Sequence, residues 1–473
     1  MKNKQITVII ILLTITAFLI TGCSTNKSGK SGKDENSAGT VTITVGDTMN
    51  IASMIPDSIT GSITWKSNKP DTASVGSDGT VTAVSVTSGL GGRYTRGPAT
   101  GNASVTASAG AESCVITVIT TTTGMTEMAE LPPMKDQFES YFLIGNIFNP
   151  GNVDSSGSLP QRLTRHYNVL TAENNMKPQY IALGRNSYSF TTADNMVNAA
   201  VASGIKVVGH TLLWHSQIPE WQKNISKEGK DAALSVMRQY ISDVAGHFAG
   251  RIYSWDVLNE AFPDGTSGNW KNSMRSENPW NKAIGSDFVY EGFLAARLAD
   301  PNAILYYNDY NLDQSGKAGM VRDMVRDVNE RYAKAYPNAN RKLIEGIGMQ
   351  SHHNTGISAS SIRSTINLFR PLGVKISISE LDLLGQGWGE FSPIGHGPNK
   401  HDVSTVTNQG LLTQARLYGQ YMKLFIENAD IIERVTLWGV TDNQSWRSGG
   451  LPLLFDEDGM AKPAYYGFAG ALR

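Results

Sequence analysis

From Met128 onward, the chain alternates short apolar runs with longer amphipathic windows. The apolar runs are rich in Val, Ile, Leu and Tyr, as buried strands are, and cover residues 141–148, 168–174, 205–214, 252–262, 303–311, 346–353, 374–383 and 434–442. The windows repeat apolar residues at intervals of three and four, as one face of a helix does, most clearly in residues 192–203, 231–249, 320–335 and 411–429. Eight strands alternating with helices predict an α/β fold, a (β/α)8 TIM barrel over residues 128–473.

Residues 40–119 have a different pattern, in which apolar and polar positions alternate one by one. The alternation is seen in four short runs: Val41, Ile43 and Val45; Ile63 and Trp65; Val81 and Ala83; and Val115, Thr117 and Ile119. Turn-forming residues at 68–71 and 77–79 lie between these runs. Short strands of period two with regular turns predict a small all-β sandwich in front of the barrel.

Three features of this small domain carry further expectations. We expect Trp65 to lie in its core, and Cys114 to be a buried thiol because alternating apolar residues surround it. A Gly-rich insertion occupies residues 85–101. We expect it to be a long solvated loop, and a recognition loop is the alternative.

The N-terminal residues have the pattern of a targeting segment. Residues 1–22 begin with Lys2 and Lys4, and their apolar run is too short to span a membrane comfortably. The tetrapeptide Ile-Thr-Gly-Cys that ends at Cys23 resembles a bacterial lipoprotein signal, which implies lipidation of Cys23 and an extracytoplasmic protein anchored at the cell surface. An ordinary secretion signal is the alternative. Residues 23–39 are rich in Ser, Gly and Lys and predict a flexible tether, and residues 120–127 predict a short linker.

Composition narrows the range of partners. Of the 473 residues, 40% are hydrophobic and 18% are charged, which is typical of globular domains with sizeable cores. The formal net charge is −1, so no global field would attract nucleic acid, and we expect no nucleic-acid partner. Two cysteines are too few for a disulfide scaffold. We expect a monomer.

Two of the predicted barrel strands end in a glutamate. The stretch Trp255–Phe262 carries Glu260 just before a Pro-Asp-Gly turn, and the run 374–383 carries Glu380. The C-terminal ends of barrel strands gather at one mouth, so the two carboxyl groups are expected to lie near each other. Such a pair can divide acid and nucleophile work on a glycosidic bond. Two structural glutamates in ion pairs are the alternative.

Seven segments support this chemistry and occur in one order along the barrel: ENNMKP (173–178), GHTLLWHSQIPEW (209–221), WDVLNEAF (255–262), YYNDYN (306–311), GMQSHH (348–353), ISELDL (378–383) and TLWGVTDNQSWR (436–447). Together they resemble the glycoside hydrolase family 10 endo-β-1,4-xylanases over residues 128–473. In the first domain, TWKSNKPDTASVGSDGTVTAV (64–84) resembles the bacterial Ig-like domain of group 2.

The resemblance implies roles for the residues at the strand ends. Glu260 is implied as general acid/base and Glu380 as nucleophile of a retaining double displacement, which needs carboxyl groups about 5–5.5 Å apart. It also needs Glu260 with a raised pKa and Glu380 ionised. Asn259 is implied to hydrogen-bond the sugar 2-hydroxyl. We expect His352 to bridge Glu380 and Asp382, and a satisfied core histidine is the alternative.

The resemblance also implies a set of sugar contacts. On the sugar before the cleaved bond the implied contacts are Glu173, Asn174, Lys177, His210, Trp214 and Gln350. Trp438 and Trp446 are implied to pack on that sugar and to limit space for a C6 hydroxymethyl group, and Tyr310 is implied as an aromatic platform on the leaving-group side. The alternatives are a weak surface ion pair between Glu173 and Lys177 and core packing for each aromatic ring.

The sequence thus predicts an endo-1,4-β-xylanase that cleaves internal bonds of xylan. A β-1,4-glucanase and a non-catalytic surface glycan-binding lipoprotein are the alternatives, and the presence of both glutamates favours an enzyme. We expect no cofactor and no metal site, because His352 and His353 are adjacent on a strand and point to opposite faces. The Ig-like domain is expected to be a spacer, with carbohydrate binding as the alternative. The Gly-rich segment 386–405 is expected to lie near the cleft.

Overall fold

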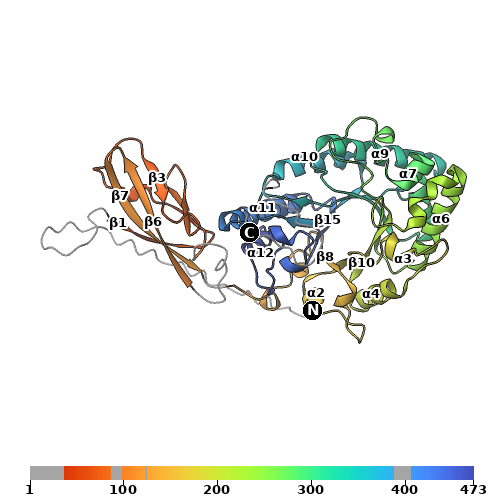
Figure 1. The fold of residues 1–473 in the computed structure, drawn as a ribbon, viewed down its shortest axis with the longest axis horizontal. Coiled ribbons are helices and arrows are strands. Elements are labelled where there is room, and N and C mark those ends of the chain that lie inside the picture. Colours follow the sequence, from red (N-terminus) through yellow and green to blue (C-terminus); the bar gives the residue numbers. More distant parts are fainter. Residues whose placement is uncertain (1–36, 87–98, 123–124, 388–405, 473) are drawn as a thin grey trace, which may run out of the picture. The chain divides into compact units, whose positions relative to one another are not determined.

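The computed structural model describes residues 37–86, 99–122, 125–387 and 406–472. The predicted signal peptide, Cys23, most of the tether, residues 87–98 of the Gly-rich insertion and residues 388–405 lie outside the described residues. The chain forms two compact units, Met1–Gly124 and Met125–Arg473 (Figure 1). In the described part of the chain, no helix combines the length and apolarity needed to cross a membrane.

The first unit is the predicted all-β sandwich. One sheet has the order β1 (Ser37–Thr44), β7 (Glu112–Thr122), β6 (Ala99–Ala109) and β3 (Thr64–Ser67), and the other has the order β2 (Thr48–Asn50), β5 (Thr80–Ala83) and β4 (Ala73–Val75). Side chains of both sheets meet in one core, to which β1 contributes Val41 and Ile43 and β5 contributes Val81 and Ala83. Trp65 packs against this core, and Cys114 is a buried free thiol, as predicted.

The pattern of β7 corrects two details of the prediction. Its buried positions are Cys114, Ile116, Val118 and Thr120, whereas the alternating set 115, 117 and 119 lies on the half-buried face. Both faces of this strand carry β-branched residues, so alternation alone does not say which one is buried. The strand also continues to Thr122, where it pairs with Ala99, so the first three residues of the predicted linker are strand.

The second unit is a closed (β/α)8 barrel. Its strands pair in parallel in the order of the chain, and the pairings β13–β15 and β16–β8 close the ring. They are β8 (Leu143–Phe148), β9 (Val169–Ala172), β10 (Lys206–Leu213), β11 (Ser254–Asn259), β12 (Ile304–Asp309), β13 (Gly346–Met349), β15 (Lys375–Leu383) and β16 (Ile432–Leu437). A two-residue strand, β14 (His352–His353), pairs with the end of β15.

Helices follow the strands around the outside of the barrel (Figure 1). The long ones are α4 (Thr191–Ala202), α6 (Lys230–His247), α8 (Asp287–Ala299), α9 (Ser315–Ala335), α10 (Ala359–Phe369) and α11 (Asn408–Glu427). The shorter ones are α1 (Met134–Gln137), α2 (Gln161–His166), α3 (Pro178–Ile181), α5 (Glu220–Lys223), α7 (Pro279–Ile284) and α12 (Pro463–Gly470). The amphipathic windows predicted α4, α6, α9 and α11. Helices α8 and α10 were not among the predicted ranges; in α8 nine of the thirteen residues are buried.

Six strands (β9, β10, β11, β12, β13 and β16) end sooner than the apolar runs predicted, and a left-handed residue follows three of them. Glu260, Asn311 and Ser351 have φ values of +55°, +51° and +61°. Such values are uncommon for residues other than glycine and interrupt a strand. The three residues lie just beyond β11, β12 and β13, so the chain turns at the mouth where the polar motifs lie.

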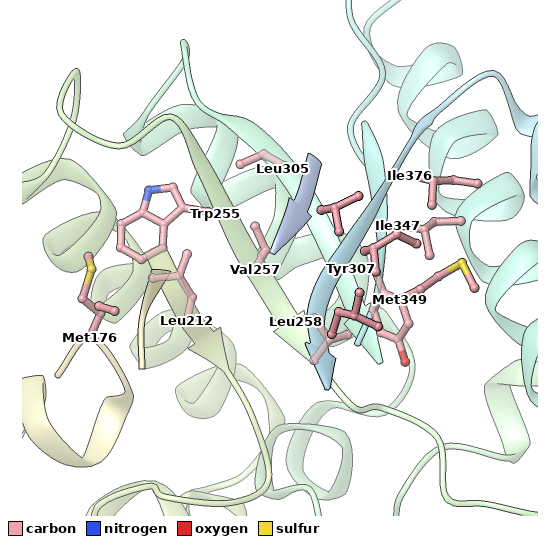
Figure 2. Close-up of a cluster of buried hydrophobic side chains, with 14 of the residues drawn as sticks. Met176, Leu212, Trp255, Val257, Leu258, Leu305, Tyr307, Ile347, Met349 and Ile376 are labelled. Carbon is pink, nitrogen blue, oxygen red and sulfur yellow. The ribbon is translucent and has the colours of Figure 1, made fainter. Parts of the chain in front are cut away.

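The barrel core fixes the strands that carry these motifs. Figure 2 shows part of this core, where Trp255, Leu258 and Tyr307 lie among other buried apolar side chains. Trp255 is fully buried and lies beside Gly209 of the neighbouring strand, with which it is in register. A Cβ atom at position 209 would lie 2.2 Å from the indole ring, so the contact requires glycine.

We expect Gly209→Ala to lower the free energy of unfolding by about 1–3 kcal/mol, the usual cost of overpacking a core. Thermal unfolding followed by circular dichroism measures the change. Gly246→Ala is the matched control, because a Cβ at Gly246 in α6 meets nothing within 4 Å and alanine favours the helix. Equal melting temperatures for the Gly209 variant and the wild type would contradict this account of the contact.

Candidate active site

Glu380 lies on β15 with its carboxylate buried at the mouth of the barrel. Oε1 accepts a hydrogen bond of 2.7 Å from Asn308 Nδ2, and Oε2 lies 3.1 Å from His352 Nε2. Burial raises the pKa of the carboxyl group, but the hydrogen bond from His352 and the electrostatic effect of the nearby His210 outweigh it, so the pKa is lowered. Glu380 is therefore an ionised, precisely held carboxylate at neutral pH.

His352 lies between Glu380 and Asp382, the position that the sequence predicted. Its Nδ1 is 3.0 Å from Asp382 Oδ2. Burial lowers the pKa of the imidazole, but the two carboxylates outweigh it and raise the pKa to about 9. Asp382 also accepts hydrogen bonds from Arg447 Nη1 and, at 3.2 Å, from Trp446 Nε1. His352 is thus an imidazolium between two carboxylates rather than a core histidine.

Glu260 has a different environment, because its donors are uncharged. Oε2 accepts a hydrogen bond of 2.9 Å from Trp214 Nε1, and Oε1 accepts one of 3.0 Å from Gln350 Nε2. The Nε2 atom of His215 lies 4.0 Å from Oε2, and the Glu260 side chain is 15% exposed. The two glutamates therefore have different surroundings: Glu260 faces neutral donors and solvent, and Glu380 faces an imidazolium.

A row of amides connects the two glutamates. Gln350 Nε2, which donates to Glu260, also lies 3.2 Å from Asn259 Oδ1. Asn308 Nδ2, which donates to Glu380, also donates to Asn259 Oδ1 at 3.0 Å. Both hydrogen bonds to Asn259 reach its amide oxygen, and among the described residues none accepts a hydrogen bond from the N–H groups of that amide. The structure thus brings the two carboxylates to one site.

The residues predicted to hold the sugar before the cleaved bond surround this site. Lys177 is 6% exposed, and its Nζ donates a hydrogen bond of 3.0 Å to Asn174 Oδ1. Glu173 Oε2 instead accepts a hydrogen bond of 2.6 Å from Asn149 Nδ2. The alternative of a surface ion pair between Glu173 and Lys177 is therefore wrong. Burial lowers the pKa of Lys177, whereas the negative charge of Glu380 acts to raise it.

Histidine and tryptophan side chains form another wall of the site. His210 Nδ1 lies 2.9 Å from Asp256 Oδ2, and both side chains are buried. The Trp438 ring is buried and lies edge-on to two histidine rings, with 5.6 Å between the ring centroids of Trp438 and His210 and 6.3 Å between those of Trp438 and His352. Trp446 is 56% exposed, although its ring lies only 5.1 Å from His352. The alternative of core packing therefore holds in part for the buried Trp438, which also lies beside the histidines of the site. It does not hold for the exposed Trp446.

The sequence model of glycosyl hydrolase family 10 matches residues 133–471. The chain belongs to glycosyl hydrolase family 10. The matched segment covers most of the chain and includes both glutamates and all of the motifs described above.

Relatives in family 10 differ in how much of their length they share with this chain. An endo-1,4-beta-xylanase of Geobacillus stearothermophilus is 35% identical over 350 residues, which are 72% of this chain and 98% of that protein. An exoglucanase XynX of Acetivibrio thermocellus is 33% identical over 353 residues, which are 72% of this chain and 29% of that protein. The chain spans only 27% to 30% of the length of four relatives, XynX among them.

One solved structure is similar over both units of the chain. It is described as the crystal structure of a bacterial Ig-like domain containing GH10 xylanase from termite gut. Its sequence is 55% identical, the match covers 92% of this chain and 98% of that one, and the TM-score is 0.74. The combination of a small strand-rich domain and a family 10 barrel is thus shared with a solved xylanase.

Sequence reasoning did not single out three residues of this family 10 site. Asn308 and Arg447 lie within quoted motifs, and each binds one of the central carboxylates, Glu380 and Asp382. The position of Asn308, a polar residue in a buried strand, was an available signal, whereas Arg447 lies in a loop beyond β16. Arg275 lies outside every quoted motif and donates to the backbone carbonyl of Glu260 at 3.0 Å.

The hydrogen bond from Asn308 leads to a prediction about activity. Asn308→Ala removes a donor to the ionised Glu380 carboxylate in a fully buried position. We expect kcat for glycoside hydrolysis to fall about 10- to 100-fold, in proportion to 1.5–3 kcal/mol for a hydrogen bond to a charged group. Ser377→Ala in β15 is the control, because the Ser377 hydroxyl has no hydrogen-bond partner among the described residues. Equal losses in the two variants would contradict a specific role for Asn308.

Proposed function

We propose that the protein is an endo-1,4-β-xylanase that hydrolyses internal β-1,4 bonds of xylan with retention of configuration. The observation that carries the proposal is the asymmetry of the two glutamates. Glu380 is ionised beside the imidazolium of His352, whereas Glu260 faces the neutral donors Trp214 and Gln350. The Geobacillus relative, which matches over nearly its whole length, supports the choice of xylan.

The proposed reaction has two displacements at the anomeric carbon. In the first, a Glu380 oxygen bonds to the anomeric carbon while the glycosidic C–O bond breaks, and Glu260 gives its proton to the leaving oxygen. In the second, the Glu260 carboxylate takes a proton from water, and the water oxygen bonds to the anomeric carbon as the Glu380 ester bond breaks. The hydrogen bonds from Asn308 and His352 keep Glu380 oriented through both steps, and Asn259 N–H groups are available to the sugar 2-hydroxyl.

The choice of a pentose rests on the residues around the same sugar. We infer that Trp438, Trp446 and the buried Lys177 leave little room for a C6 hydroxymethyl group. A pocket rejects one additional group by about 1–3 kcal/mol, so weak activity on β-1,4-glucan is expected. Cleavage of β-1,4-glucan is the second candidate function, and one family 10 relative, XynX, is named an exoglucanase.

Product analysis on β-1,4-xylan, with cellulose as the second substrate, tests the proposal. Early products are followed by proton NMR, which separates the two anomers before they interconvert. Short xylo-oligosaccharides in the β configuration are the expected result. Early α anomers would overturn retention, and turnover of cellulose without turnover of xylan would transfer the function to a glucanase. Binding of xylan without any cleavage would favour a glycan-binding protein.

We propose that the strand-rich first unit is a bacterial Ig-like domain that acts as a spacer. Its two-sheet core and the termite-gut xylanase support this identity. Retention of the isolated residues 37–124 by insoluble xylan would contradict a role limited to spacing.

We also propose that Cys23 is lipidated and anchors a monomeric enzyme outside the cytoplasm. Mass spectrometry of the mature N-terminus distinguishes a diacylated Cys23 from an unmodified one, and light scattering of the released enzyme measures its mass.

A further inference from the structure

The side chain of Arg275 contacts both the acid/base residue and the platform on the leaving-group side. Its Nε donates to the backbone oxygen of Glu260 at 3.0 Å, and its Nη2 donates to the hydroxyl of Tyr310. Its Nη1 donates to Glu277 at the protein surface at 3.0 Å. The Arg275 side chain is only 12% exposed. One planar guanidinium therefore spans from the backbone of Glu260 to the ring of Tyr310.

Glu260 needs such support because its backbone is in an uncommon conformation. Its φ of +55° lies in the left-handed region, which for a residue other than glycine persists only where the surroundings fix it. The Glu260 N–H donates to the oxygen of Asn308 at 2.8 Å, and the next N–H, of Ala261, donates to the hydroxyl of Tyr307 at 3.1 Å. The oxygen of Ala261 accepts from the Arg275 N–H at 2.8 Å. Arg275 thus holds this turn through both its backbone and its side chain.

The ring of Tyr310 is fixed from another direction. The ammonium of Lys317 lies 3.5 Å from the ring centroid, and the Lys317 side chain is fully buried. Lys317 Nζ is 2.9 Å from Asp309 Oδ1 and 3.2 Å from Asp264 Oδ1. The N–H of Tyr310 also donates to Asp309 Oδ1 at 2.9 Å. With one face over a paired ammonium and its hydroxyl bound to Arg275, the ring has little freedom to turn.

We propose that Arg275 is a positioning residue that keeps the Glu260 carboxyl group and the Tyr310 platform in a fixed relation. The inference rests on the proposed glycosidase function. A sugar that leaves from the site rests on Tyr310, and its oxygen must receive the proton of Glu260. The guanidinium joins the two supports with donors in a rigid fork, a geometry that lysine cannot reproduce. Arg275 therefore sets how well the proton donor is aligned with the leaving oxygen.

This role affects substrates unequally. A sugar leaving group is a poor leaving group and requires a well-placed proton, whereas a dinitrophenolate leaves without one. Misplacing the acid should therefore slow cleavage of xylotetraose and spare the first step on 2,4-dinitrophenyl β-xylobioside. A purely structural loss would lower both rates together. The ratio of the two kcat/KM values consequently reports on alignment and is insensitive to the amount of folded enzyme.

The test compares Arg275→Lys with Glu277→Gln on the full mature chain. We expect Arg275→Lys to lower kcat/KM on xylotetraose about 10- to 100-fold, the cost of a small misalignment, and to change kcat/KM on the dinitrophenyl substrate less than about 3-fold. Glu277→Gln is the matched control, because the Glu277 side chain is 54% exposed and its ion pair contributes little. Equal losses on both substrates, or no loss on xylotetraose, would overturn the proposal.

Tyr310→Phe keeps the test decisive if the lysine variant does not fold. It retains the ring and removes only the hydroxyl that Arg275 binds. We expect a rise in KM for xylotetraose of about 3- to 10-fold with an unchanged dinitrophenyl rate, corresponding to one lost hydrogen bond. An unchanged KM would contradict the link between Arg275 and the platform. Failure of the wild type on xylotetraose would refute the proposed function itself, which separates the two hypotheses.

Discussion

Replacing Glu380 with alanine is expected to lower kcat on xylan by at least about 10⁴-fold, because the variant lacks the nucleophile of the first displacement. The carboxylate is buried and is bound by Asn308 and His352. Initial rates of reducing-sugar release measure the loss. Glu427→Ala is the matched control, since Glu427 is a 43% exposed glutamate in a surface ion pair with Arg363.

Sodium azide makes the same variant diagnostic for the mechanism. Alanine leaves space where the carboxylate was, and azide can attack the anomeric carbon of an aryl β-xylobioside from that side. The expected product is the α-configured glycosyl azide, formed with one inversion. Glu260→Ala should instead yield the β-configured azide, because azide then replaces water in the second displacement. Formation of the β-configured azide by the Glu380 variant would contradict the assignment of the nucleophile. So would a variant that keeps full activity on xylan and does not respond to azide.

The barrel could be predicted from the sequence because its strands are buried on both faces, whereas several of its helices are buried on one side only. Strand β15 is buried at every position after Lys375, whereas α6 and α9 carry one apolar stripe. The two patterns differ in period, so they separate without knowledge of the fold. Helices α8 and α10 were not predicted, although their residues are patterned much as those of α6 and α9 are.

The carboxylates of the site could be predicted, but the residues that hold them could only be predicted in part. Glu260, Glu380 and His352 stand in motifs, and their order along the chain is enough to place them at one mouth. Arg275 reaches Glu260 from a loop, and its neighbours in sequence include nothing that indicates this contact. Contacts of this kind depend on where a loop returns in space, and local patterns do not record that. The left-handed backbone conformation of Glu260 is likewise not indicated by the sequence around it.

The charge on His352 leads to the second large effect, on stability. Its pKa is about 9 in the folded protein and 6.5 in a model peptide, so the folded state holds the proton more tightly. The resulting stabilisation is complete below pH 6.5 and is lost as pH rises through 9. A shift of this size corresponds to about 3 kcal/mol. We therefore expect the difference in free energy of unfolding between the wild type and His352→Gln to shrink by about 3 kcal/mol between pH 6.5 and 9.

The neighbouring histidine is the matched control for this experiment. Burial and the charge of Arg447 lower the pKa of His353 to about 3, so His353 is neutral in the folded protein over the whole window. In the unfolded chain it is also mostly neutral above pH 6.5. His353→Gln should accordingly shift the urea unfolding curves by a constant amount from pH 6.5 to 9. The same slope in both variants would contradict an imidazolium at His352.

The loss of this charge should also appear in the activity. Burial raises the pKa of Glu380, and the hydrogen bond and charge of His352 are among the effects that bring it below 4.5. The acidic limb of kcat/KM in the wild type is therefore expected below pH 4.5, where the nucleophile becomes protonated and inactive. In His352→Gln the effect of burial is less well opposed, so the limb should move to higher pH. An unmoved limb would mean that other groups, such as Asn308 and His210, are sufficient to keep Glu380 ionised.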